Sequence, residues 1–519
     1  MWAQPHGTTF LLVLILGVAL YSAARGVDFG HHWDEPKIVD SLCGTIRQGR
    51  LLPGWYNYPS MCYDLALVCT IPDVAARVSG RLPRGHGSLM RQVRSRGFRL
   101  RLRLLFVLIS LASTVWVYLF VLAYQQDRTE ALVAASLLAL SWEIGYHIRW
   151  VAPDAVLMQF GAMVLLLLGV AAKQARPFPW LAGAYVAAGM ACGTKYPGVL
   201  LLVPVLAVSV RLTAHGMCAS SRLRTLSALL TVFVLTYLAV SPGTLIDPVR
   251  FLRDILYEMH HYGAGHGCHT VQPGVPCLAL MLQYLALVLF SHYELIAGFC
   301  FAAVVAGVFA VWRHDRQAAA ILLPFPFAYI VYMSLQRVLI VRNLLVVAPF
   351  LAVLAARGLM FWQRTYLPRK PYCALLPIAA GVTLVVNLSW LTRAADSIAN
   401  RGRLPLPAQA IQYIRHNPTT PFLLATALGK DLTAYLRTPD ALPNIADHAS
   451  AGAKLLFYSS EADSMRNRWP CNAPNQYELL PDGPYEVNFD YYPSWAGDRR
   501  IVVVPADRAD RLGVATWHR

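Results

Sequence analysis

Long apolar runs separated by short polar segments dominate this chain of 519 residues. A helix that spans a bilayer needs about 20 consecutive, largely apolar residues. Runs of this length or slightly shorter lie at 8–24, 100–123, 131–146, 155–172, 180–192, 199–210, 226–240, 295–312, 318–335, 344–360 and 374–391. The pattern predicts a polytopic α-helical membrane protein with about eleven transmembrane helices, the shorter of which tilt or lie in thinner bilayer.

Composition supports this class. The chain is 56% hydrophobic and 14% charged, whereas a soluble domain carries about 25% charged residues. Its net charge of +17 favours contact with anionic lipid or phosphate in a membrane protein, and no compact basic module for nucleic acid is present. The ten cysteines are scattered without the spacing of a zinc site.

Three polar regions interrupt the apolar pattern: a first loop at 25–99, a loop at 241–292 and a tail at 394–519. Within the first loop, residues 58–71 are apolar but too short to span, so we predict a helix on the membrane surface. The short loops of one side carry more Lys and Arg, which predicts an inner N-terminus and places all three polar regions outside. The first run is either an anchor or a cleaved signal, and both place residues 31–36 outside.

The polar tail predicts a small α/β domain on the outer side. Residues 407–416 have the pattern of a helix, and three short runs are typical of strands: 421–428, 454–458 and 500–504. Cys471 is the tail's single cysteine. We therefore divide the chain into a transmembrane domain at 1–393 and an outer domain at 394–519.

Acidic residues at the ends of apolar runs are the main candidates for chemistry. Asp34 and Glu35 follow the first run, and Asp154 opens the fourth. Carboxylates near a bilayer are costly and persist mostly where they face a polar cavity or act in chemistry. The alternative is that Asp34-Glu35 caps the next helix, with Pro36 in its first turn, and that Asp154 is a helix cap. Acids that converge from separate loops can make a general base or hold a divalent cation.

Several short motifs in a fixed order resemble the GT-C superfamily of membrane glycosyltransferases. They are Trp33-Asp34-Glu35, Gly49, Tyr56-Asn57-Tyr58-Pro59, Arg99-Leu100, Arg149 to Asp154, Gly193-Thr194-Lys195-Tyr196, and Arg342-Asn343 before Val347-Ala348-Pro349. The most similar members are the polyprenyl-phosphate-dependent enzymes, which are protein O-mannosyltransferase-like and aminoarabinose-transferase-like. The resemblance covers about residues 8–395, while the tail matches the outer C-terminal domain of the family only in position.

The resemblance implies transfer of a sugar from a polyprenyl-phosphate donor to an outer-side hydroxyl of a protein, lipid A or a glycan, with inversion. Asp34 matches the family's general base, Glu35 its companion and Asp154 a second acid. A lipid phosphate is a workable leaving group only if cations receive its charge. The candidate substrate-binding residues are Tyr58, Arg149, Lys195, Tyr196, His266 and Arg342. Each basic residue among them has an alternative interpretation as a side chain that snorkels to the interface.

The loop at 241–292 permits two interpretations. Its potential metal ligands are Glu258, His260, His261, His266, Cys268 and His269, which suit a transition metal but match no standard spacing. Its glycines and the Tyr262–Gly267 segment instead resemble a mobile loop that covers the donor site in the superfamily, and we favour this interpretation. No cofactor is certain, and a divalent cation stays an option. A disulfide between Cys268 and Cys277 is equally open.

Two other classes of protein compete with a transferase. A transporter or flippase for a lipid-linked sugar also needs acids in a membrane cavity, but no internal repeat typical of transporters is present. The third class is a non-catalytic scaffold. No Gly-rich phosphate loop and no Asp-x-Asp occurs, which disfavours a nucleotide-sugar donor. We expect a multi-pass protein of a bacterial inner membrane, with its active site facing the periplasm.

Overall fold

The computed structural model describes residues 5–25, 27–28, 34–83, 85–214, 218–265, 270–291, 293–366, 375–401, 406–436, 442–448, 450–458, 478–479, 501–506 and 516. Within them, eight helices are long and apolar enough to cross a membrane: Gly7–Arg25, Arg96–Gln125, Pro153–Ala171, Tyr196–Ala214, Ala219–Val240, Glu294–His314, Arg316–Ser334 and Val341–Thr365. Shorter apolar helices lie at Phe178–Cys192, Val275–Leu287 and Ile378–Thr392. The prediction of a polytopic helical membrane protein is confirmed.

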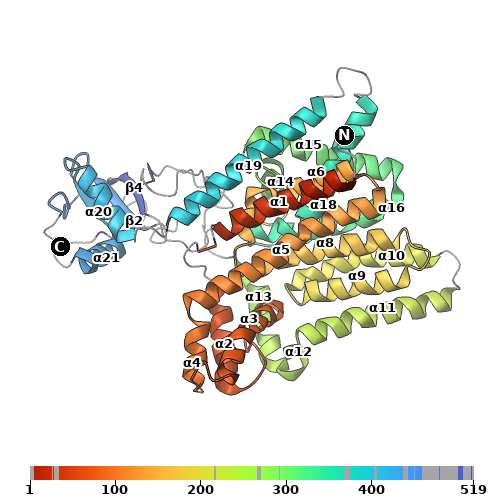
Figure 1. The fold of residues 1–519 in the computed structure, drawn as a ribbon, viewed down its shortest axis with the longest axis horizontal. Coiled ribbons are helices and arrows are strands. Elements are labelled where there is room, and N and C mark those ends of the chain that lie inside the picture. The colour runs from red at the N-terminus through yellow and green to blue at the C-terminus, as the bar shows by residue number, and fades with distance from the viewer. Residues whose placement is uncertain are drawn as a thin grey trace.

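The apolar helices lie side by side in one bundle (Figure 1). Their bounds are α1 Pro5–Arg25, α5 Arg96–Gln125, α8 Pro153–Ala171, α9 Phe178–Cys192, α10 Leu202–Ala214, α11 Ala219–Val240, α15 Glu294–His314, α16 Arg316–Leu322, α17 Pro324–Ser334, α18 Ala348–Tyr366 and α19 Leu375–Arg401. The 3₁₀ helices η1 Tyr196–Leu201 and η3 Val341–Val347 lead into α10 and α18. Both spans therefore begin with a tightly wound turn.

The structure differs from the sequence prediction in one apolar run and in one loop. The run at 131–146 is not one span but α6 Arg128–Ala139 and α7 Trp142–His147. Ser141 separates them, because its Oγ accepts from the Ile144 amide and donates to the Leu289 carbonyl at 2.6 Å. The predicted loop at 241–292 contains the helices α12 Gly243–Ile246, α13 Pro248–Ala264 and α14 Val275–Leu287.

The first loop folds into three helices, α2 Glu35–Gln48, α3 Met61–Val78 and α4 His86–Val93, at one end of the bundle (Figure 1). The apolar face that α3 exposes consists of Val68, Ile71, Val74 and Val78. Their spacing of three or four residues puts them on one side of the helix, as in a helix that lies on a membrane surface. The predicted helix is present, although it begins at Met61 rather than at residue 58 and continues to Val78, and its place on the membrane surface stays a prediction.

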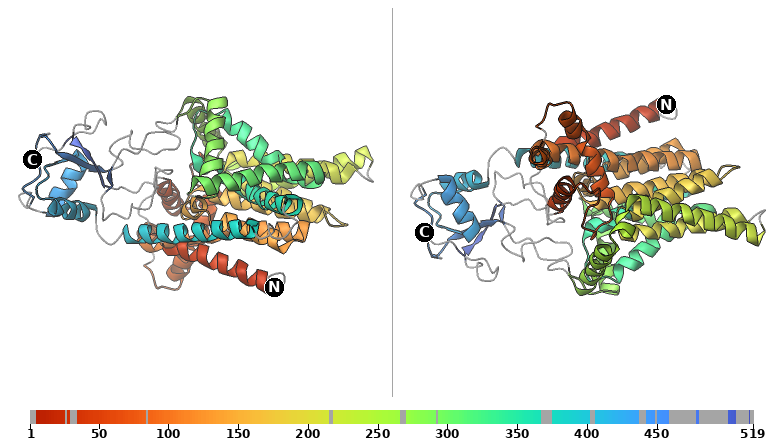
Figure 2. Two further views of the ribbon diagram at one scale, coloured as in Figure 1. Left: turned by 90° about the horizontal axis from the view of Figure 1, so that it is seen from above. Right: turned by 90° about the horizontal axis from the view of Figure 1, so that it is seen from below.

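The C-terminal region contains α20 Leu406–His416, β1 Phe422–Leu424, α21 Thr426–Leu436, β2 Lys454–Tyr458, β3 Glu478–Leu479 and β4 Ile501–Pro505. The four strands form one sheet in the order β1-β2-β4-β3, in which only the β1–β2 pair is parallel. The predicted strand at 421–428 was too long, since α21 begins at Thr426. Figure 2 shows these elements beyond the end of α19, away from the bundle. Cys471 lies outside the described residues.

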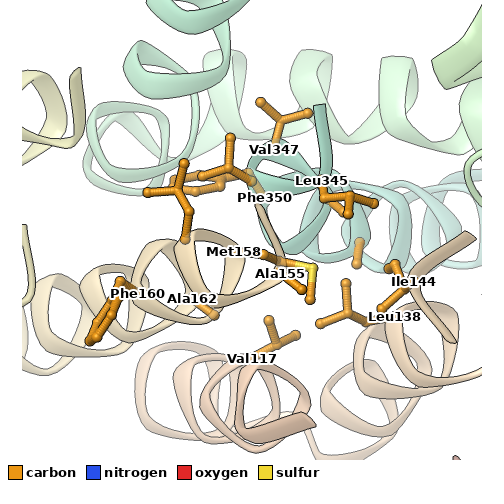
Figure 3. Packing of buried hydrophobic residues seen from close by; sticks show 14 of the residues in the cluster. Val117, Leu138, Ile144, Ala155, Met158, Phe160, Ala162, Leu345, Val347 and Phe350 are labelled. Carbon is orange, nitrogen blue, oxygen red and sulfur yellow. The ribbon is translucent and has the colours of Figure 1, made fainter. Parts of the chain in front are cut away.

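Helix α8 is the centre of the buried core. Figure 3 shows Ala155 and Met158 of α8 between Val117 of α5 on one side and Leu345 and Phe350 on the other. All five side chains are at most 2% exposed. The start of α8, which carries Asp154, is therefore fixed by dense packing.

Close packing of α15 on α18 depends on Gly307. A Cβ atom at Gly307 would overlap the backbone carbonyl of Leu354, whereas Gly298 of the same helix has open space around it. We expect Gly307→Ala to destabilise the protein by about 1–3 kcal/mol, because the two helices must separate. Thermal unfolding in detergent measures this, and Gly298→Ala is the matched control with unchanged or higher stability. Equal unfolding temperatures for the two variants would contradict the packing argument.

Candidate functional site

Four charged side chains from four separate segments meet at one end of the bundle. Arg342 donates from Nη2 to Asp34 Oδ2 at 2.8 Å, and its Nε lies 3.2 Å from Asp154 Oδ2. Lys195 Nζ donates to Asp154 Oδ1 at 2.7 Å. Three of the four side chains are at most 7% exposed, and Asp34 is 15% exposed. Two carboxylates and two cations thus share one site that is largely shielded from solvent.

Each of these residues stands at the end of a helix. Asp34 is the N-cap residue of α2, yet its side chain makes no capping hydrogen bond. Asp154 follows Pro153 in the first turn of α8, where Ala152 is the N-cap. Neither carboxylate therefore serves as a helix cap, and the capping alternative for both acids is wrong. Lys195 lies in extended backbone before η1, and Arg342 lies within η3.

Burial and charge act in opposite directions on Asp34. Burial raises the pKa of its carboxyl above the ordinary 3.8, the Arg342 guanidinium opposes that rise, and the Asp154 carboxylate adds to it. The net direction is upward, which makes Asp34 a stronger base than an exposed aspartate. For Lys195, burial lowers the pKa, but the charge and hydrogen bond of Asp154 together with Tyr262 outweigh burial, so the pKa is raised and the amine stays charged.

Asn343 links this site to two tyrosines. Its Oδ1 accepts from Lys195 Nζ at 2.6 Å, and its Nδ2 donates to Tyr262 Oη at 3.2 Å. The Tyr329 hydroxyl donates to the Asn343 carbonyl at 2.8 Å. The sequence analysis did not select Asn343, Tyr262 or Tyr329 as site residues. The motif Arg342-Asn343 and the segment that starts at Tyr262 were noted in the sequence, whereas Tyr329 carried no signal.

A cavity of about 460 Å³ opens beside this site. It is lined by Asn57, Tyr58, Lys195, Tyr196, Pro197, Val199, Leu200, Ile255, Glu258, Met259, Tyr262, Tyr329, Tyr332, Met333, Gln336 and Asn343. The predicted substrate-binding residues Tyr58, Lys195 and Tyr196 therefore share one cavity, whose wall combines a cationic end with apolar side chains. Such a mixture suits the junction of a phosphate with a hydrocarbon chain.

Helix α13 holds the first loop against this cavity. Asp254 Oδ2 accepts from the Tyr56 amide at 2.9 Å, and Glu258 Oε2 accepts from Asn57 Nδ2 at 3.0 Å. The Tyr196 hydroxyl donates to the Tyr56 carbonyl at 2.6 Å. Glu258, which the sequence offered as a metal ligand, is a contact between α13 and the first loop. Asp254 was not recognised from the sequence.

Glu35 points to a different partner from Asp34. Its Oε2 accepts from Arg103 of α5, at 2.7 Å from Nη2 and 3.0 Å from Nε. Arg103 also donates to the Val27 carbonyl at 2.9 Å. Glu35 lines a separate cavity of about 260 Å³ with Arg94 and Arg99. The structure thus does not bring Glu35 to the contacts of Arg342 and Lys195.

Arg149 also lies apart from the four-residue site. Its guanidinium is buried and donates to the carbonyls of Ser22 and Ala23, at 2.8 and 3.2 Å, at the end of α1. It also lies 5.6 Å from the Trp142 ring centroid. These contacts join α1 to α7, so the structure offers no sign of substrate binding by Arg149.

The sequence offered the loop at 241–292 as a metal site. Among the described residues, no three His, Cys, Asp or Glu side chains gather in a potential metal site. His266, Cys268 and His269 lie outside the described residues, so their part of both interpretations is untested. Cys277 is a buried free thiol whose Sγ contacts the Met333 carbonyl.

Comparison with known proteins adds a family and a fold. Residues 93–244 match the family described as dolichyl-phosphate-mannose-protein mannosyltransferase. The fold is similar to that of ArnT from Cupriavidus metallidurans in the apo state, with a TM-score of 0.51 and 15% identity over 95% of this chain and 98% of that chain. The chain thus shares its fold with ArnT, and part of it matches the mannosyltransferase family.

Two further solved structures are similar to this chain. ArnT from Cupriavidus metallidurans bound to undecaprenyl phosphate has a TM-score of 0.46 and 16% identity over 96% of this chain and 99% of that chain. The archaeal oligosaccharyltransferase AglB from Archaeoglobus fulgidus, in complex with an inhibitory peptide and a dolichol-phosphate, has a TM-score of 0.44 and 13% identity over 86% and 70%. No curated protein sequence matches this chain significantly.

The buried pair of Glu35 with Arg103 makes a testable contribution to stability. Glu35→Leu leaves the Arg103 guanidinium buried without its carboxylate, and we expect a loss of about 3–5 kcal/mol in the free energy of unfolding. The double variant Glu35→Leu/Arg103→Met should recover most of that loss. Asp40 lies in α2, as Glu35 does, and forms an exposed pair with Arg94. Asp40→Leu breaks that pair and should lower the free energy of unfolding by less than about 1 kcal/mol. A single Glu35 variant as stable as the double variant would contradict the pairing.

Proposed function

We propose that this glycosyltransferase moves a sugar from a polyprenyl-phosphate donor to a hydroxyl group of an acceptor on the outer side of the membrane. The acceptor is a protein, lipid A or a glycan, and the reaction inverts the anomeric centre. The observation that carries the proposal is the arrangement around Arg342, which binds Asp34 and Asp154 together while Lys195 binds Asp154. The dolichyl-phosphate-mannose family match supports a lipid-linked donor.

Asp34 is the proposed general base. In a single displacement, the acceptor oxygen bonds to the anomeric carbon while the bond from that carbon to the phosphate oxygen breaks. The acceptor proton goes to the Asp34 carboxylate, and polyprenyl phosphate leaves with the bonding electrons. Burial supports this role, because it raises the pKa of Asp34 and so strengthens it as a proton acceptor.

Lys195 and Arg342 are the proposed partners of the donor phosphate. Both are buried and already neutralised by carboxylates, so an incoming phosphate exchanges one anionic partner for another. The adjoining cavity gives the phosphate a cationic end at Lys195 and gives the first isoprene units apolar walls at Val199 and Met259. Asp154 keeps the two cations together while the negative charge on the leaving group grows.

Glu35 acts in this proposal as a positioning residue. It immediately follows Asp34, and its pair with Arg103 fixes the first turn of α2 to α5. The side chain of Asp34 is thereby presented to Arg342. Loss of this anchor is expected to lower activity through displacement of Asp34 rather than through loss of a second acid.

The decisive experiment compares Asp34→Asn with Asp40→Asn, which removes the same charge from an exposed site on the same helix. We expect Asp34→Asn to lower kcat by about 10²–10⁴-fold, because general base catalysis contributes about that much. Purified full-length enzyme is assayed with a polyprenyl-phosphate sugar by mass spectrometry of the acceptor fraction. Binding of the donor lipid should persist in Asp34→Asn and so show that the variant is folded, although its unfolding temperature should fall because Arg342 keeps only Asp154 as a carboxylate partner.

Three outcomes would oppose this proposal. Full transfer by Asp34→Asn would remove Asp34 as the base. If transfer were absent in the wild type while the lipid-linked sugar still crossed a vesicle membrane, a flippase would be the better description. Loss of activity in Asp40→Asn to the same extent would show that the effect is one of general charge.

The acid side of the pH profile gives an independent check on Asp34. The base must be ionised, so kcat/KM falls as the pH falls through the pKa of Asp34, which burial places above 3.8. Arg342 and Lys195 both lower that pKa, Arg342 more strongly. We therefore expect Arg342→Gln to move the acid limb to higher pH, and Lys195→Gln to move it less far in the same direction. An acid limb that stays in place or moves to lower pH would contradict the assignment.

A further inference from the structure

A second cavity, of about 890 Å³, lies inside the bundle and is almost entirely apolar. Its walls come from α10, α14, α15, α16, α17 and α18, through Arg211, Leu282, Leu285, Phe301, Val304, Val305, Val308, Trp312, Arg316, Ala319, Ala320, Leu323, Pro324, Pro326, Phe327, Ile330, Leu351 and Leu354. Val305 and Phe327 are 56% and 72% exposed, so the cavity opens on the side of the bundle that faces lipid.

Among the described residues, the charged side chains that line this cavity are two arginines, and they lie at the end of the bundle opposite to the Asp34 site. Arg211 is near the end of the span that starts beside Lys195, and Arg316 starts the span that ends at Ser334. Arg316 lies 4.7 Å from the ring centroid of Trp312. A tryptophan beside a basic residue is typical of the membrane interface. Figure 1 places α16 at the far end of the bundle from α2 and α3.

Helix α17 separates this cavity from the candidate active site. Tyr329, Tyr332 and Met333 line the cavity beside Lys195, whereas Phe327 and Ile330 on another face of α17 line the second cavity. The donor therefore has its own apolar chamber, and the second cavity calls for a different occupant.

We propose that the second cavity binds an anionic glycerophospholipid of the membrane leaflet opposite to the Asp34 site. Its acyl chains fill the apolar space between α15 and α17, and its phosphate lies at Arg211 and Arg316. The charge of the rim supports this occupant, since both charged lining residues are cationic. The nearest acid in sequence, Asp315, already accepts from the Ala318 amide and the Tyr124 hydroxyl. The proposal is independent of the sugar-transfer chemistry.

Such a lipid has a structural consequence for the enzyme. The same helix α17 that forms one wall of the lipid cavity carries Tyr329, whose hydroxyl holds the backbone of Asn343. Asn343 in turn accepts from Lys195. A bound lipid therefore supports α17 from the side opposite to this network and stabilises its position.

The test measures lipid retention by the full-length protein. The protein is placed in phosphatidylcholine bilayers that contain a minority of phosphatidylglycerol, and the lipids that stay bound are identified by native mass spectrometry. We expect one retained phosphatidylglycerol in the wild type. In Arg211→Gln/Arg316→Gln, loss of two basic groups should weaken retention about thirtyfold. The matched control is Arg224→Gln/Arg313→Gln, which removes two arginines from the same end of the bundle outside the cavity and should retain the lipid.

A second variant tests the cavity without a change of charge. Ala320 lines the cavity, so Ala320→Phe should occupy the space of an acyl chain and reduce phosphatidylglycerol retention with both arginines present. Thermal unfolding in pure phosphatidylcholine verifies that each variant is folded. Equal loss in the arginine control, retention by the Ala320 variant, or polyprenyl phosphate as the retained lipid would each overturn the proposal.

Discussion

The contact of Arg342 with two carboxylates is the interaction on which the candidate active end of this protein depends. Its guanidinium is 3% exposed and lies within 3.2 Å of both Asp34 and Asp154. A buried guanidinium is tolerated only where carboxylates surround it. The loop before α2 and the starts of α8 and η3 must therefore meet at one point. The remaining contacts of the first loop, such as that of Tyr56 with Asp254, restrain a segment that has to reach this point.

The charges around Arg342 balance one another. With Lys195 included, the site holds two positive and two negative groups, so it is stable without a ligand. A phosphate that enters disturbs the balance and competes with Asp34 for Arg342. Release of Asp34 from Arg342 would raise its pKa further, because Arg342 opposes that rise. In the proposed reaction, donor binding would thus strengthen Asp34 as a proton acceptor, through the same guanidinium that is proposed to receive the phosphate charge.

The sequence predicted the class of fold and the charged centre of the site, because apolar length and residue position at helix ends carry that information. The partner of Glu35 could not be predicted in this way. Successive residues at a helix start point about 100° apart, so the neighbour of Asp34 reaches Arg103 instead of Arg342. The same limit applies to Arg149, whose contact with Ser22 depends on how α1 packs. The predicted helix boundaries were wrong where a polar capping residue such as Ser141 interrupts an apolar run.

Helix α17 borders both the cavity beside Lys195 and the apolar cavity. It has 11 residues, and Tyr329, Tyr332 and Met333, at i, i+3 and i+4, form one face. Phe327 and Ile330 lie on another face, towards the apolar cavity. The tyrosine hydroxyl at 329 needs a polar partner and finds it at Asn343, whereas Phe327 needs only hydrocarbon. A shift of α17 towards either cavity would break one set of contacts, so the proposed lipid and the geometry at Lys195 would both depend on the position of α17.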